Sequence, residues 1–233
     1  MVTEHFEILN NFMGIGEPAG GIWFVGLEEA YQWNKNVEDD KKWYDRYKDR
    51  YFCIETGEID RSAKEYGKGF TKIYDIMSKI LTGLKTNPDE FNGWKRYRAK
   101  VLFQKGSGVF QTNLYPLGKK RLAEWPPHYE RIFGFGKNDI DRYLSIVREQ
   151  RFPKLRAFWK KSRPLSTICF GVAGWGDFVN LFELDKEEFM EEDSIRVYKK
   201  QKTIFSPFFD YRHMSHKRIS RIVNDLKHME VRA

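Results

Sequence analysis

The sequence predicts an α/β fold, a three-layer sandwich in which helices flank a central, mostly parallel sheet of four strands. Four short apolar runs, at residues 22–26, 108–113, 166–171 and 202–207, are expected to form buried strands. Helical segments alternate with these runs, which is typical of a parallel sheet with helices on both faces. No linker rich in Gly, Ser or Pro divides the chain, so we expect one domain over residues 1–233.

Helices are expected where apolar residues recur at helical spacing. The clearest case is residues 70–84, whose apolar positions lie on one helical face. Asn138 or Asp139 can cap a helix, and Pro153 is expected to interrupt the helical pattern that follows. Ser215 is expected to cap the last helix, which carries apolar residues on the side that faces the core.

The chain is basic, with 41 Lys and Arg against 33 Asp and Glu, a net charge of +8. The excess is clustered, for example around residues 95–100, 119–121 and 212–221. A basic surface attracts phosphate backbones, which favours DNA as the partner, although many mildly basic proteins bind no nucleic acid. Aromatic residues make up 16% of the chain, and those among the cations suit either base stacking or an ordinary core.

Several classes of protein are disfavoured. Cys53 and Cys169 are too few for a four-thiolate zinc or iron–sulfur site, and Cys169 lies within an expected strand, which favours reduced thiols and the cytoplasm. No apolar run approaches the roughly 18 residues that span a bilayer, so we expect no membrane association. Residues 1–11 lack the pattern of a secretory signal.

Polar or turn-forming clusters follow each expected strand. Ligands of open α/β sheets bind outside the carboxyl ends of the strands, so the site is expected there. The four clusters are Gly26-Leu27-Glu28-Glu29-Ala30, Asn113-Leu114-Tyr115-Pro116, Gly171-Val172-Ala173-Gly174-Trp175-Gly176, and Ser206-Pro207-Phe208 with the loop that continues to His216.

In this order the motifs resemble those of the uracil-DNA glycosylase superfamily, over nearly the whole chain. Glu28 stands where that family places a water-orienting Asp or Asn, and Asn113 matches its base-binding Asn. Ser206 and Pro207 match a His-Pro-Ser or Asn-Pro-Ser motif, with Ser206 in the first place. The chain departs from the family at Ser206 and at Glu29, which replaces a usual Pro.

The resemblance implies a monofunctional DNA glycosylase that flips a base, hydrolyses its N-glycosidic bond and leaves an abasic site without a cofactor. The departures at Glu29 and Ser206 favour a modified or damaged base. The superfamily includes repair enzymes for uracil and thymine mismatches. It also includes an antiphage branch that removes glucosylated hydroxymethylcytosine from phage DNA, so the expected role is repair or antiviral defence.

Three residues are expected to be catalytic. Glu28 would orient water and stabilise charge at the sugar, unless it or Glu29 is only an acidic residue in the first turn of a helix. Asn113 would read the edge of the base, unless it is a turn residue. His213 would stabilise the departing anion or bind a phosphate. Which of the two glutamates is the catalytic carboxylate stays open.

Further residues are expected to contact the substrate. Glu29 can accept from an exocyclic amine, Tyr31 can stack on a base or pack in the core, and Ser206 can donate to a phosphate or the base. The expected substrate-binding residues are Gly26, Glu29, Tyr31, Ser206 and Pro207. The apolar loop tip can wedge into DNA or pack under the last helix, whose start can hold a phosphate. The expected DNA-binding residues are Phe208, Tyr211, Arg212, Met214, Ser215, Lys217 and Arg218.

The sequence also bears on metal binding, on nucleotide binding and on functions other than base excision. His213 and His216 have no third ligand at a metal-binding spacing, so we expect no metal. The turn at residues 171–176 lacks the Lys of a phosphate-binding loop and is expected to form the rim of the site. We expect the glycosylase to be a monomer. Two alternatives to a glycosylase stay open: a non-catalytic nucleic-acid-binding protein on the same scaffold, and an unrelated nucleotide- or sugar-processing α/β hydrolase.

Overall fold

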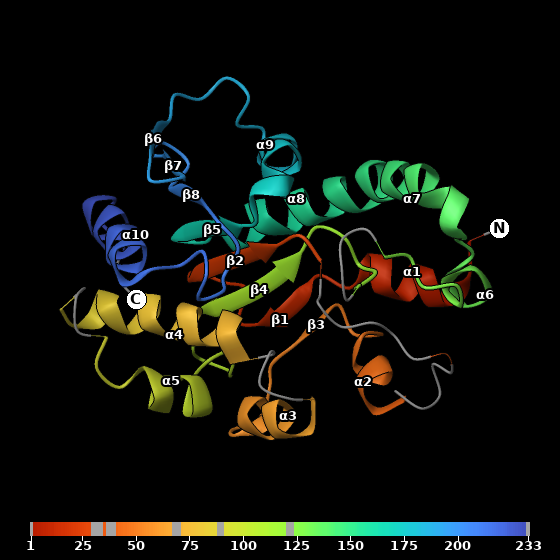
Figure 1. Cartoon of the computed structure of the whole chain (residues 1–233), viewed down its shortest axis with the longest axis horizontal. Coiled ribbons are helices and arrows are strands. Elements are labelled where there is room, and N and C mark those ends of the chain that lie inside the picture. The colour runs from red at the N-terminus through yellow and green to blue at the C-terminus, as the bar shows by residue number, and fades with distance from the viewer. Residues whose placement is uncertain are drawn as a thin grey trace.

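A single sheet runs through the middle of the molecule, and helices cover both of its faces (Figure 1). The computed structural model describes residues 2–28, 35, 41–66, 71–87, 91–119 and 124–231. Within these residues the sheet has eight strands in the order β3-β1-β4-β2-β5-β8-β7-β6. The strands are β1 (Gly14–Gly16), β2 (Ile22–Gly26), β3 (Tyr51–Phe52), β4 (Val109–Asn113), β5 (Ser166–Phe170), β6 (Met190–Glu192), β7 (Ile195–Tyr198) and β8 (Thr203–Ser206).

The four expected strands are confirmed, but the sheet is larger and mixed. Strands β4, β2, β5 and β8 are neighbours and pair in parallel. On one side β1 is antiparallel to β4 and β3 is parallel to β1, while on the other side β7 and β6 continue antiparallel from β8. The expectation of a four-stranded sheet was wrong because the added strands are short and lack an apolar run; β1 is Gly-Ile-Gly, and β6 is Met-Glu-Glu and exposed.

The helices divide between two apolar cores, one on each face of the sheet. Side chains of β2 alternate between them, with Trp23 and Val25 in the first core and Ile22 and Phe24 in the second. Helices α1, α6, α7, α8 and α9 enclose the first core, and α4, α5 and α10 the second. The helices are α1 (Glu4–Asn11), α2 (Lys41–Arg46), α3 (Glu58–Tyr66), α4 (Thr71–Lys85), α5 (Trp94–Lys100), α6 (Tyr129–Phe133), α7 (Ile140–Ile146), α8 (Phe152–Ser162), α9 (Trp175–Phe182) and α10 (His216–His228), with short 3-10 turns η3 (Lys137–Asp139) and η5 (Val172–Gly174).

Two helices with clear sequence signals form as expected. Helix α4 occupies nearly the expected residues and packs against α10 across the second core. Ser215 caps α10, since its hydroxyl accepts the backbone N–H of Arg218 at 3.3 Å.

Pro153 does not interrupt the helical path as expected. A π-helical turn, η4 (Val147–Arg151), joins α7 to α8, and Pro153 lies in the first turn of α8 directly after this wider turn. The wider turn directs Arg151 into the protein, where the residue is only 2% exposed.

The buried guanidinium of Arg151 joins two distant segments. It donates to the carbonyl oxygens of Asn10 at 3.0 Å and Phe12 at 2.6 Å, at the end of α1. It also donates to the carbonyls of Asn113 at 3.0 Å and Leu114 at 3.0 Å, at the end of β4. Hydrogen bonds to a buried charge are stronger than neutral ones, so this side chain fixes the strand end where Asn113 lies.

We expect Arg151→Met to lower the free energy of unfolding by at least about 3 kcal/mol, because it leaves several buried carbonyls without a donor. Urea titration followed by circular dichroism measures this loss. Arg61→Met is the matched control, because Arg61 is exposed on α3 and the change should cost less than about 0.5 kcal/mol. Equal stability of the two variants would contradict the role given to Arg151.

Candidate functional site

The carboxyl ends of β2, β4 and β5 form the floor of the candidate site. Gly26 pairs with Asn113 in the sheet, and Phe170 ends the strand on the other side. A Cβ atom at Gly26 would lie 2.5 Å from the Asn113 Oδ1 and 2.9 Å from the Phe170 Cζ. Glycine is therefore required here, because it lets an amide and an aromatic ring close over the strand end.

The backbone of Asn113 is held in place, while its side-chain amide makes no hydrogen bond within the described residues. Its backbone carbonyl accepts from Arg151, and it lies half-buried beside Gly26. Within the described part of the chain its side-chain amide has no hydrogen-bond partner, so one acceptor and two donor positions are available to a ligand.

Aromatic rings continue the floor towards the loop after β8. The Phe170 ring stacks on that of Phe209, with centroids 4.6 Å apart and an interplanar angle of 13°, and lies 6.1 Å from the ring of Phe208. Phe209 is fully buried, whereas Phe208 is 37% exposed. A flat ligand held by Asn113 would thus meet a partly exposed ring on the same face of the sheet.

Glu28 lies just beyond the end of β2. Backbone pairing continues past the strands, since Tyr115 donates to the Leu27 carbonyl at 2.8 Å. The Glu28 carboxylate then pairs with the Lys119 ammonium at 3.2 Å, and both side chains are nearly buried. Burial raises the pKa of Glu28 from 4.5 to about 7, although Lys119 opposes this shift.

The contacts of Glu28 lie on the side of the first core. The Lys119 ammonium is 5.6 Å from the centroid of the Trp125 ring, and the Glu28 charge acts on the buried Tyr143 hydroxyl. Tyr143 in turn accepts the backbone N–H of Leu117 at 3.2 Å. The structure therefore places Glu28 and Asn113 at adjoining strand ends, with Glu28 turned to Lys119 and Asn113 to Gly26.

A second polar cluster beside the strand ends was not expected from the sequence. The Tyr115 hydroxyl donates to Asp177 on α9, and the Arg148 Nε donates to the same carboxylate at 2.9 Å. Burial and the hydrogen bond to Asp177 raise the pKa of Tyr115. Tyr115, Asp177 and Arg148 come from three separate parts of the chain, so no local pattern could have joined them.

Asp210 organises the loop after β8 and was also missed. Its carboxylate accepts from the backbone N–H of His213 at 3.0 Å, the His213 Nδ1 at 2.8 Å and the Arg212 Nη2 at 2.9 Å. Burial raises the pKa of Asp210, but the hydrogen bonds from Arg212 and His213 outweigh it and lower the pKa to about 2. The ionised Asp210 thus holds the Nδ1 proton of His213, whose side chain is 52% exposed and keeps Nε2 available.

The remaining expected residues divide between surface and core. Phe208, Tyr211 and Arg212 are exposed. Ser206 and Pro207 are buried, and the Ser206 hydroxyl bonds the Pro207 carbonyl.

Three other expected contacts are occupied within the protein. Met214 belongs to the second core and does not form part of the exposed tip. Lys217 pairs with Asp193 at 2.9 Å, and Arg218 donates to the carbonyl of Asp193 at 3.1 Å. Glu29 and Tyr31 lie outside the described residues.

The glycine-rich turn after β5 closes onto the first motif. A Cβ atom at Gly174 would lie 2.1 Å from the Leu27 Cδ2, and one at Gly171 would lie 3.2 Å from the Leu27 Cδ1. These glycines make room for Leu27 between the ends of β2 and β5. From there the chain after β2 leads to β4 on one side, and the chain after β5 leads to β8 on the other.

No model of a known protein family matches the chain, and no curated protein is similar to it. Among the described residues, no group of three or more His, Cys, Asp or Glu side chains is placed to hold a metal ion. In the same part of the chain, no helix is both long and apolar enough to cross a membrane.

The raised pKa of Glu28 predicts a pH-dependent effect of Glu28→Gln on stability. The folded chain binds this proton more tightly than the unfolded chain, so raising the pH through 4.5 to about 7 lowers the unfolding free energy of the native protein. Glutamine removes this loss. The variant should therefore gain up to about 3 kcal/mol relative to the native chain between about pH 5 and pH 8, measured by urea titration.

Glu188→Gln removes the same charge from an exposed position and should show no such trend. A stability difference between Glu28→Gln and the native chain that stays constant with pH would contradict the assignment.

Proposed function

We propose that the chain is a monofunctional DNA glycosylase of the uracil-DNA glycosylase superfamily, acting on a modified or damaged base. The observation that carries the proposal is the pair of groups at adjoining strand ends. Asn113 offers an available amide over Gly26, and Glu28 offers a carboxyl whose pKa is about 7. A net charge of +8 supports a polyanionic partner.

In the proposed reaction, the flipped base lies against Asn113 and the exposed ring of Phe208, and its sugar reaches across the end of β2 towards Glu28. Water adds to C1′ of the sugar while the bond from C1′ to the base nitrogen breaks. Glu28 takes the proton from water, and the bonding electron pair leaves with the base. Asn113 donates its amide N–H to the departing base, and His213 donates from Nε2 in its doubly protonated form; the base then takes up a proton.

The biological setting is proposed on the same basis. Base removal would serve DNA repair or defence against phage DNA that carries modified cytosine. Cys53 and Cys169 are free thiols, which supports the cytoplasm, and the protein would act as a monomer.

The activity is tested by incubating the protein with duplexes that contain uracil, hypoxanthine, alkylated bases or phage-type modified cytosines. Alkali cleavage and mass spectrometry then detect abasic sites and released base. We expect Glu28→Gln and Asn113→Ala each to lower the rate about 100-fold or more. Glu188→Gln and Asn224→Ala are matched controls at exposed positions and should retain full activity. Absence of base release from every substrate would refute the proposal.

The pH profile offers a separate test of Glu28. If the ionised carboxylate accepts the proton from water, kcat/KM should rise about tenfold per pH unit below about 7 and level off above it. Rates of base release between about pH 5.5 and pH 8.5 measure this profile. A rate that falls as the pH rises through 7 would assign Glu28 the role of an acid.

One observation favours a non-catalytic alternative. The ion pair with Lys119 occupies the Glu28 carboxylate, as a structural pair would. A nucleic-acid-binding protein on this scaffold would show salt-dependent DNA binding without base release, and Glu28→Gln would leave its DNA affinity unchanged.

A further inference from the structure

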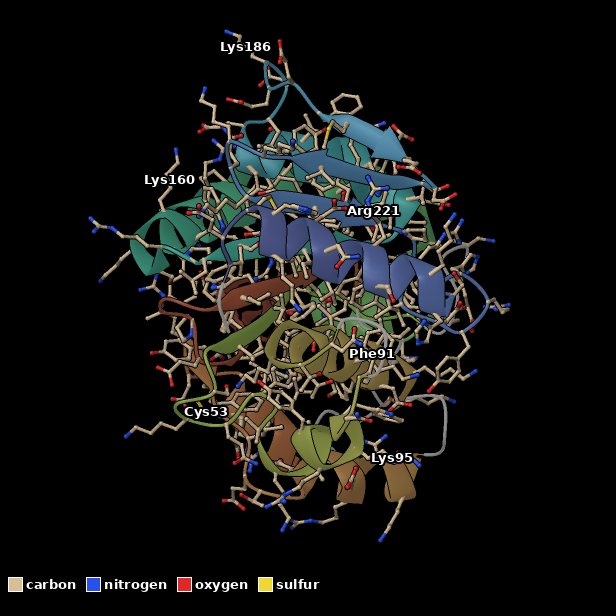
Figure 2. All side chains as sticks on the ribbon, turned by 90° about the vertical axis from the view of Figure 1, so that its left-hand side faces the viewer. Cys53, Phe91, Lys95, Lys160, Lys186 and Arg221 are labelled. Atoms are coloured by element: carbon tan, nitrogen blue, oxygen red, sulfur yellow. The ribbon has the colours of Figure 1, made fainter. Side chains whose placement is uncertain are left out.

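An exposed and a half-buried aromatic ring meet cations that form no ion pair among the described residues, at the place where α4, α5 and the loop after β8 come together. We call this the Trp94 surface; it consists of Lys79, Trp94, Lys95, Arg96 and Tyr211. Helices α4 and α5 pack against each other, and the Tyr211 hydroxyl reaches Asp75 on α4. Figure 2 shows Lys95 at the lower end of the molecule, far from the Lys186 loop at the upper end.

Lys79 lies between the two rings. Its ammonium is 5.0 Å from the centroid of the Trp94 ring and 5.3 Å from that of Tyr211, which is half exposed. The two rings are therefore close neighbours on the surface. In the described residues Lys79 forms no ion pair, and its ammonium lies against the faces of two rings.

Two carboxylates near this surface, those of Asp75 and Asp60, are paired with a cation. Arg98 pairs with Asp75 at 2.5 Å and with Asp60 at 2.7 Å. Burial, the hydrogen bond to Asp75 and its charge raise the pKa of Tyr211 to about 12, so the phenol stays uncharged. The hydrogen bond also fixes the Tyr211 ring, so less side-chain entropy is lost when a ligand stacks on it.

The outward cations remain available. Lys95 and Arg96 are exposed, and neither forms an ion pair within the described part of the chain. Lys95 lies 5.7 Å from the centroid of the Trp94 ring. The surface thus combines two aromatic rings with three positive charges that form no ion pair among the described residues.

We propose that the Trp94 surface binds single-stranded DNA, with phosphates on Lys79, Lys95 and Arg96 and bases stacked on Trp94 and Tyr211. Sequence-tolerant binding of single strands uses this combination of cations and rings. A duplex would satisfy the cations alone, because its bases are already stacked on each other. An acidic peptide would likewise use the cations and leave the rings unused.

The surface also continues from the candidate site. The ring of Phe170 lies over Gly26 and beside Phe208, and Phe208 and Tyr211 belong to the same loop. A strand that leaves the site along this loop meets Tyr211 and then Trp94. In this respect the inference rests on the proposed function and specifies an unpaired strand beside the target base.

The test is fluorescence anisotropy with unmodified single-stranded DNA of about 15 nucleotides, which contains no base to release. Binding is therefore measured whether or not the protein is a glycosylase. We expect Trp94→Leu and Tyr211→Ala each to raise Kd about tenfold, and Tyr211→Phe to keep most of the affinity because it keeps the ring. Lys79→Ala should lower the slope of log Kd against log salt by about 0.7.

Lys186→Ala is the matched charge control and should leave both Kd and the slope unchanged. Single-stranded RNA of the same sequence distinguishes the source of the ligand, and tighter binding of DNA supports the proposal. The proposal is overturned if the folded Trp94→Leu and Tyr211→Ala variants bind single strands as well as the native chain. It is also overturned if the native chain binds duplex more tightly or if polyglutamate displaces the DNA at equal charge concentration.

Discussion

The buried guanidinium of Arg151 is the interaction on which the candidate site depends most. The last carbonyls of a helix have no partner within that helix, and those at the end of α1 are buried beside a strand end. Arg151 donates hydrogen bonds to these carbonyls. The same guanidinium donates to the Asn113 and Leu114 carbonyls and so holds them in place. One side chain therefore joins α1, β4 and the η4 turn into a single frame. The position of the Asn113 amide over Gly26 follows from that frame.

Elements with strong local signals were predictable from the sequence, and elements that depend on a neighbour were not. Strands β2, β4, β5 and β8 are runs of apolar residues between turn signals, and Ser215 is a clear helix cap. Strand β1 exists because glycines let it approach β4; a Cβ atom at Gly14 would lie 2.2 Å from the Gln111 carbonyl oxygen. A strand that depends on such close approach shows no alternation of apolar and polar residues in the sequence, so the sequence does not predict it. Strand β6 is polar because it lies exposed at the edge of the sheet.

The candidate site shows the same division. Gly26 and Asn113 could be placed together because both end neighbouring parallel strands. The partners of the charged groups could not, since Lys119, Asp177 and Arg148 reach the strand ends from separate loops and helices. Asp210 was closer to prediction, standing three residues before His213, but only the folded loop shows that it receives both backbone and side-chain donors. Burial of Ser206 and Met214 likewise depends on what packs above them.

The π-helical turn between α7 and α8 has a consequence for how the length of this chain can vary. A π turn holds one more residue than an α turn, so the helices before and after it can both keep their apolar faces on the core. Shortening residues 147–151 by one would leave an ordinary continuous helix with those faces unchanged, but without the bulge that carries Arg151 inward. One inserted residue is thus enough to create the bulge that directs Arg151 to the end of β4. The packing of the helices on the core does not change with it.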